Sequence, residues 1–161
     1  MGKMLVGAVL MAVVGTAAGC SSSVQVNEVK IDEAPAASPA KVVIEVDLTK
    51  NNEQGEAVTL ENGLKREFRS AGYEVLPGNL TVRCEIVELH RGSTVANVLI
   101  GLGAGGDHAD IRVQVVDSSG SQRMSFLVRG SVHDKRYREL HEVIGQYVAH
   151  RIVEEVTKAC R

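Results

Sequence analysis

Residues able to do chemistry are few in this 161-residue chain, and their spacing completes no catalytic set. His141 and Glu142 begin a segment like the zinc helix of metalloproteases, but Gly145 stands where that motif needs its second histidine. His108 and Asp110 could share a metal from one face of a strand, but no further ligand stands at a suitable spacing. A Gly-x-Ser-x-Gly nucleophile motif is missing as well. We therefore expect a protein that is not an enzyme and that has no metal, cofactor or catalytic residues.

A glycine-rich run over residues 101–106 could suggest a phosphate-binding loop. Such a loop must lead into a helix, whose first amides and dipole hold the anion. Here Asp107 and Asp110 follow within an alternating strand pattern, so acidic side chains would repel a phosphate. The chain also has a net charge of -2, three tyrosines, two phenylalanines and no tryptophan. Nucleic-acid binding needs positive charge and exposed rings, so we expect neither a nucleotide nor a nucleic acid as partner.

The N-terminus has the layout of a secretory signal. Lys3 precedes an uncharged apolar stretch over residues 4–14, which is too short to be a comfortable membrane span. Residues 17–20, Ala-Ala-Gly-Cys, resemble the lipobox of bacterial lipoproteins. The resemblance implies cleavage before Cys20, a diacylglyceryl group on its sulfur and an acyl group on its amine, and several acyl chains anchor a protein stably. The alternative is an ordinary cleaved signal with an incidental cysteine.

The residue after the lipobox and the composition that follows predict location and domain layout. Ser21 rather than aspartate follows the cysteine, which the lipoprotein resemblance associates with a lipid anchor in the outer membrane and a domain facing the periplasm. Residues 1–19 are the predicted signal peptide, and residues 20–40 the lipidated N-terminus with a flexible tether rich in small residues and proline. Residues 24–31 could instead join the domain as an edge strand. Residues 41–161 are predicted to form one periplasmic domain.

Hydropathy patterns in the predicted domain favour more strands than helices. Alternating apolar and polar residues predict strands over residues 42–46, 73–76, 80–86, 109–115 and 124–128. Four-residue apolar repeats predict two helices, over about residues 55–71 and about 135–159. A phase slip at Val87 indicates a β-bulge. Because each helix has one apolar side, we expect an α+β two-layer sandwich in which a mostly antiparallel sheet of about four or five strands carries two helices on one face.

The chain also resembles DUF4410, a family of bacterial lipoproteins of unknown function. The similarity covers residues 59–115 and rests on glycines and hydrophobic residues. The matching stretches are residues 60–68 (Leu-Glu-Asn-Gly-Leu-Lys-Arg-Glu-Phe), 71–75 (Ala-Gly-Tyr-Glu-Val), Gly92, 101–105 (Gly-Leu-Gly-Ala-Gly) and 115–117 (Val-Val-Asp). The resemblance implies an envelope lipoprotein and no particular reaction, because the family has no established activity.

Two cysteines, Cys84 and Cys160, lie in the predicted domain. Cys84 shares the inward phase of its strand, and Cys160 ends the helix expected to cover that side of the sheet. In an oxidising compartment the two can form a disulfide. The alternative is a buried thiol at Cys84 and a free thiol at Cys160.

Residues 92–106 join two predicted strands without a charged residue, and ordinary hairpin loops are much shorter. One interpretation extends the strands through residues 98–100 and lets the glycines form a bend. The other is a docking edge or a membrane-contacting tip, since an exposed apolar patch needs such a purpose. The candidate contact residues are Val98, Leu99, Ile100, Gly101, Leu102, Gly103 and Gly105.

Charged side chains fall on the outward phase of the predicted strands. They are Arg83, Glu85, Asp110, Arg112, Arg123 and Arg129. They form either a cross-strand charge lattice or a face that docks a partner. By analogy with small envelope lipoproteins, the leading hypothesis is a non-enzymatic accessory or adaptor domain that binds another envelope component, expected to be a protein. The alternatives are an envelope hydrolase and a lipid or small-molecule carrier, and an enclosed apolar cavity would favour the carrier.

Overall fold

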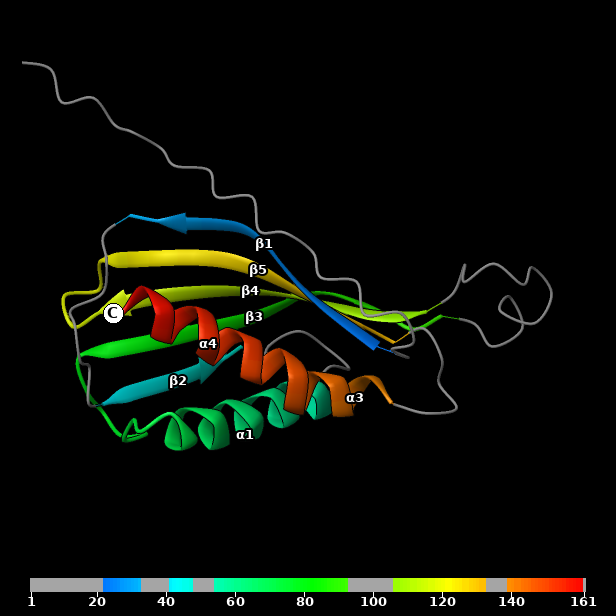
Figure 1. Cartoon of the computed structure of the whole chain (residues 1–161), viewed down its shortest axis with the longest axis horizontal. Helices are drawn as coiled ribbons and strands as arrows, with labels where there is room; N and C mark the ends of the chain where they lie inside the picture. The colour runs from blue at the N-terminus through cyan, green and yellow to red at the C-terminus, as the bar shows by residue number, and fades with distance from the viewer. Residues whose placement is uncertain (1–21, 33–40, 48–53, 93–105, 133–138, 161) are drawn as a thin grey trace, which may run out of the picture.

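Five strands form one open sheet. The structure is a computed structural model that describes residues 22–32, 41–47, 54–92, 106–132 and 139–160. The strands of these ranges are β1 (Ser22–Ile31), β2 (Val42–Val46), β3 (Leu80–His90), β4 (Asp107–Asp117) and β5 (Gln122–Val132). They lie in the order β1-β5-β4-β3-β2 (Figure 1). Neighbours are antiparallel except β2 and β3, which are parallel.

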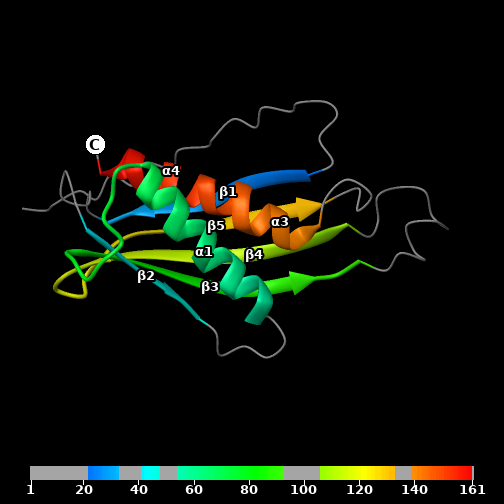
Figure 2. The same ribbon diagram turned by 90° about the horizontal axis from the view of Figure 1, so that it is seen from below.

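Two helices cover one face of this sheet (Figure 2). The first is α1 (Gln54–Ser70). The second runs without a break through α3 (Leu140–Val143), the π-helical turn η1 (Ile144–Val148) and α4 (Ala149–Ala159). None of these described helices is long and apolar enough to cross a bilayer. The predicted α+β two-layer sandwich is therefore confirmed.

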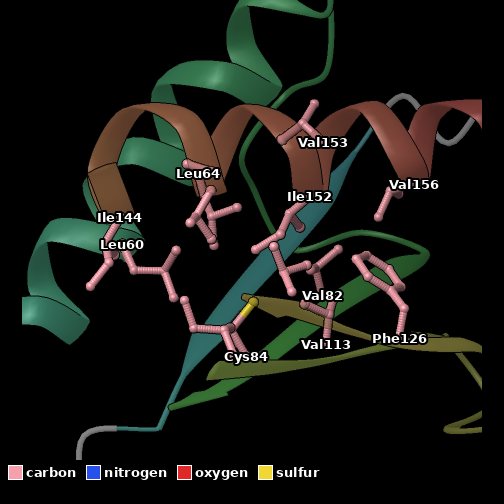
Figure 3. Packing of buried hydrophobic residues seen from close by; sticks show 14 of the residues in the cluster. Leu60, Leu64, Val82, Cys84, Val113, Phe126, Ile144, Ile152, Val153 and Val156 are labelled. Atoms are coloured by element: carbon pink, nitrogen blue, oxygen red, sulfur yellow. The ribbon is translucent and has the colours of Figure 1, made fainter. Parts of the chain in front are cut away.

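Hydrophobic side chains fill the layer between the sheet and the helices. Leu60, Leu64 and Phe68 lie one turn apart on α1 and are fully buried. From the sheet, Val82 and Val113 point toward Ile152 of α4 (Figure 3). Each such side chain contributes roughly 1.5–3 kcal/mol on burial. The alternating residues of the central strands thus supply one wall of the core and leave their polar neighbours on the opposite face.

Strand β1 corrects the predicted domain boundary. Ser22–Ile31 pairs along β5, so the prediction of a flexible tether is wrong for these residues, and the domain begins before Lys41. The physical reason is that Val24 and Val26 are half-buried and pack against the core. The alternative prediction, an edge strand within residues 24–31, is confirmed.

Other local predictions have mixed outcomes. The phase slip at Val87 is a bulge, since the pairing of β3 with β4 shifts between Ile86 and Glu88. Residues 73–76 form no strand and make only one isolated bridge, between Glu74 and Lys41. The second helix begins at Leu140 rather than near residue 135, because Glu139 has extended backbone angles.

Candidate functional site: the uncovered face of the sheet

The sheet face that carries no helix is polar and charged. We call it the outer face. Strand alternation places there Gln25 of β1, Glu45 of β2, Arg83 and Glu85 of β3, Asp110, Arg112 and Gln114 of β4, and Ser125, Leu127 and Arg129 of β5. Arg123, the fourth arginine predicted to point outward, bonds the carboxylate of Asp117 at the β4–β5 turn.

Three ion pairs cross the outer face along a diagonal. Arg83 Nε lies 2.7 Å from Glu45 Oε2, between β3 and β2. Arg112 Nη1 lies 2.9 Å from Glu85 Oε2, between β4 and β3. Each arginine is on the strand nearer to β5, and each acid is on the strand nearer to β2. This confirms the predicted cross-strand charge lattice. It also shows that all the pairs are oriented alike, with the acidic side chain toward β2 and the basic side chain toward β5.

The third pair, Arg129 with Asp110, is the most buried member of the diagonal. The guanidinium binds the carboxylate with two bonds, 2.6 Å from Nε to Oδ1 and 2.5 Å from Nη2 to Oδ2. The side chain of Asp110 is only 7% exposed, against 44% for Arg129. The hydrogen bond from Arg129 lowers the pKa of Asp110, and the same bond raises the pKa of Arg129. The pair therefore stays charged across the physiological range.

A shallow hollow opens on the outer face beside the β2 edge. Its volume is about 320 Å³. The lining residues include both charges of two ion pairs, Glu45 with Arg83 and Glu85 with Arg112, and the amide of Gln114. The lining also includes Val46 and Cys84. Its charged and amide groups can bind both hydrogen-bond donors and acceptors of a partner.

Polar contacts also gather at one end of the sheet, which we call the loop end. It is defined by Ser22, His90, Asp107 and Val132, which the strand register brings together. His90 and His108 stack with ring centroids 5.1 Å apart. The backbone N–H of Gly92 donates to Asp107 Oδ1 over 2.7 Å, and this carboxylate is buried.

An ion pair between Arg91 and Glu56 ties the loop end to the start of α1. Sequence patterns gave no signal for this contact, because the two residues are 35 positions apart and belong to different periodicities. It fixes the chain directly after β3. The buried carboxylates of Glu56 and Asp107 thus position the two chain ends that flank residues 93–105.

Several predicted site residues lie outside the described residues. They are Cys20 and the contact candidates Val98, Leu99, Ile100, Gly101, Leu102, Gly103 and Gly105. Only the flanking residues of the segment, Gly92 and Gly106, are described, and both belong to the loop end. Lipidation and the contact segment therefore stay predictions.

The two cysteines of the domain are separate thiols, so the predicted disulfide between Cys84 and Cys160 is not formed. In Figure 3 the sulfur of Cys84 points from the sheet toward the helix layer, while Val156, one turn before Cys160, lies near Phe126. Burial raises the pKa of Cys84 to about 12. Burial also raises the pKa of Cys160, which a hydrogen bond with Tyr73 partly offsets.

The residues whose spacing in the sequence resembled that of metal ligands make other contacts or are exposed. Asp110 is occupied by Arg129, and His108 stacks on His90 with Glu88 Oε1 3.6 Å from its Nε2. His141 and Glu142 are exposed at the start of the second helix. Within the described ranges, no group of three or more histidine, cysteine or acidic side chains is arranged to hold a metal.

Solved structures share this fold at low sequence identity. PelC from Paraburkholderia phytofirmans, described as a dodecamer, aligns with a TM-score of 0.57 and 12% identity over 84% of this chain and 97% of that chain. A point variant of the same PelC gives 0.55 with the same identity and coverage. A minor lipoprotein from Acinetobacter baumannii gives 0.45 and 16% identity, over 77% of this chain and 94% of that chain. At 12% identity the likeness to PelC shows the fold alone.

No curated protein matches the sequence. The match to a family is specific and covers α1, the three central strands and the outer-face charges they carry. Residues 56–134 fit the sequence model described as "Domain of unknown function (DUF4410)". The resemblance to the DUF4410 family found in the sequence is thereby confirmed over these residues.

Proposed function

We propose that the protein is a lipid-anchored accessory protein of the bacterial envelope that works by binding and not by catalysis. The lipobox-like residues 17–20 support the anchor, with Cys20 as its attachment point at the outer membrane and the domain in the periplasm. The observation that carries the binding role is the diagonal of ion pairs on the outer face, which gives an uncovered sheet face a fixed direction of charge.

The packing of the core supports an adaptor over the carrier alternative. Hydrophobic side chains from both layers meet between sheet and helices, where a carrier would need an open apolar cavity. The hydrolase alternative has less support, because the acids and histidines of the loop end are engaged in structural contacts. We propose that the partner is an envelope protein with a basic patch opposite Glu45 and Glu85 and an acidic patch opposite Arg129, because complementary charges select partner and orientation.

Photo-crosslinking in intact cells tests this function. A photoreactive residue replaces Gln114 on the outer face, and a matched one replaces Glu142, which is exposed on the helical side. We expect a defined protein adduct at residue 114 and none at 142. The adduct should disappear when Arg83 and Arg112 are both changed to glutamate, which inverts two charges of the diagonal. Equal adducts at 114 and 142, or one that survives the inversion, would contradict a docking role.

The anchor would set the orientation of the domain. Cys20 precedes Ser22, the first residue of β1, by two positions, so an extended chain spans at most about 7 Å between them. Ser22 pairs with Val132, which in turn pairs with Asp107. We propose that the lipid holds the loop end against the membrane, on the side where β3 ends and β4 begins.

We also propose that the chain acts as a subunit of a homo-oligomer. The support is that PelC, which shares the fold, is described as a dodecamer. Mass measurement of the detergent-extracted lipoprotein by light scattering tests this proposal. A single monomeric mass at all concentrations would overturn it.

A further inference from the structure

Five large hydrophobic side chains of the described residues are exposed. They are Val29, Ile31, Val58, Leu76 and Tyr147. Tyr147 lies in the turn η1, which contacts α1 and β5. Val29 and Ile31 belong to edge strand β1, and we call this side the β1 flank. Ile31 is the most exposed of the five, at 57%.

The remaining two belong to the other side, the β2 flank. Val58 is 47% exposed on α1, which packs over β2. Leu76 is 55% exposed, two residues after Glu74, which bridges to Lys41 beside β2. Scattered exposed hydrophobic residues need no explanation. Val29 and Ile31, however, lie on an edge strand, whose free backbone groups can pair with another chain.

The cross-strand register shows that the two flanks match. One row of residues runs Ile31, Met124, Val115, Val82, Ile44 across the sheet, and its central members are buried. Both ends, Ile31 and Ile44, keep some exposure. The next row runs Lys30, Ser125, Gln114, Arg83, Glu45 on the outer face. This row ends in a cation on β1 and an anion on β2.

Strand directions allow the rows to continue into a second copy. Counted across the sheet, β1 runs antiparallel to β2, since β1 is antiparallel to β5 and β5 runs with β3 and β2. A copy placed beside the first in the same orientation therefore sets β1 against β2 as an antiparallel pair. In the register that continues both rows, Ile31 would face Ile44, Val29 would face Val46, and Lys30 would face Glu45.

We propose that this protein self-associates head to tail, with the free edge of β1 in one copy pairing with β2 of the next copy. The proposal rests on the proposed homo-oligomer and names its contact surfaces. Hydrophobic pairs would bury the exposed side chains of β1 against half-buried ones of β2. Lys30 makes no ion pair with any residue in the described part of the chain. The side chain of Glu45 is 51% exposed and contacts Arg83 through Oε2, so its other carboxylate oxygen can accept a bond from Lys30.

Orientation of the anchor favours this arrangement over a two-fold contact. A pairing of β1 with its own copy reverses the second sheet, so that the two Ser22 ends point in opposite directions. Head-to-tail pairing keeps every Ser22 end on one side, where all lipids can enter one membrane. Repeated contacts of this kind close into a ring when the rotation between copies permits.

Cysteine crosslinking of the full-length protein in cells tests the register. Neighbouring residues in an antiparallel pair have Cα atoms about 4.5–5.5 Å apart, within reach of a disulfide. We expect the double variant Lys30→Cys/Glu45→Cys to form a ladder of dimers, trimers and larger species on non-reducing gels. Each single variant should stay uncrosslinked. The matched control Lys30→Cys/Gln114→Cys keeps the same row but uses a central strand, and it should give no ladder.

The outcomes separate this inference from the proposals on which it rests. Strong dimers from Lys30→Cys alone would show a β1–β1 contact and overturn head-to-tail pairing. An oligomer by light scattering without any ladder would overturn the edge register and leave self-association standing. A monomer in both measurements would overturn both.

An independent variant tests the apolar part of the contact. Ile31→Asp should reduce the oligomeric fraction by roughly tenfold or more, as loss of a contact anchor does, with an unchanged melting temperature of the monomer. Leu127→Asp on the central outer face is the control and should leave the oligomer intact. A normal oligomer in Ile31→Asp would overturn the proposal.

Discussion

Arg66 of α1 donates a hydrogen bond from Nη2 to the carbonyl oxygen of Gly145, 2.8 Å away in the π-helical turn of the second helix. The turn brings this carbonyl to the first helix at the point where Gly63 and Gly145 let the two backbones approach. A Cβ atom at residue 63 would lie 2.9 Å from the Cβ of Ala149 as well as against the Gly145 backbone. Glycine on both helices and arginine beside them thus fix the helix crossing.

The close crossing predicts that Gly63→Ala is destabilising. We expect a loss of about 1–3 kcal/mol in the free energy of unfolding, because the added methyl group meets backbone that cannot give way easily. Denaturant unfolding followed by circular dichroism measures it. Gly55→Ala, in the first turn of the same helix with open space around its Cβ, is the control and should change the free energy of unfolding by under about 0.5 kcal/mol. Equal changes in the free energy of unfolding for the two variants would contradict a close approach of the helices at Gly63.

The bond from Arg66 has a smaller predicted effect. Arg66→Met keeps the aliphatic stem and removes the donor, so we expect a loss of about 1 kcal/mol in the same unfolding measurement. Arg69→Met is the matched control, because Arg69 is exposed on α1 without an ion pair to the described residues. A loss of similar size in the control would show that helix propensity, not the bond to Gly145, is responsible.

The Arg129–Asp110 pair predicts a pH-dependent contribution to stability. Because the folded pKa of Asp110 is lowered, its contribution is complete above the unfolded pKa of about 4 and is lost as pH falls through the folded value. Asp110→Asn should therefore cost about 1–2 kcal/mol at pH 7 and progressively less below pH about 4. Unfolding curves between neutral and acid pH measure the difference. Glu45→Gln breaks an exposed pair and should cost under about 1 kcal/mol.

Thiol labelling tests the state of Cys84 and Cys160. With the pKa of Cys84 raised to about 12 and both side chains buried, neither should react at neutral pH in the folded protein. Both should react in denaturant without reductant. Ser118→Cys at the exposed turn is the positive control for accessibility. Failure of both native cysteines to label in denaturant would reveal a disulfide.

Lipidation is tested by Cys20→Ala. We expect the variant to leave the membrane fraction and to keep its uncleaved size, because the anchor and the cleavage both require this cysteine. Ser21→Ala is the control and should fractionate like the parent protein. A Cys20→Ala protein of mature size in the membrane fraction would contradict the anchor.

The sandwich could be predicted because its elements carry strong local periodicity. Leu60, Leu64 and Phe68 repeat at one helical turn, and the alternation in β3 and β4 sets one face inward. The same alternation also predicted that Arg83, Arg112 and Arg129 point outward. Strand β1 could not be predicted with the same certainty, because of its hydrophobic residues only Val24 and Val26 pack against the core, and an edge strand depends on its neighbour for its stability.

Contacts between distant segments could not be predicted. The partners of Asp110 and Glu56 depend on register and on helix placement, which no local pattern encodes. The π-helical turn at Ile144–Val148 lies within one continuous run of helix, and the apolar spacing of that run predicts only a helix. The disulfide prediction failed for a related reason. Strand alternation predicts the side of the sheet on which Cys84 lies, but it does not predict which part of the second helix packs over Cys84, and so not the distance from Cys84 to Cys160.

The junction of anchor and fold at β1 also has a mechanical consequence. If a partner held on the outer face pulls against a lipid on Cys20, the force enters the domain at Ser22 and runs along the axis of β1. Hydrogen bonds between antiparallel strands lie perpendicular to that direction, so the pairs from Ser22↔Val132 to Asn27↔Leu127 carry the load together in shear. Strands loaded in shear do not unzip one bond at a time. With the lipid attached as proposed, the edge strand would carry the tension between the membrane and the rest of the sheet.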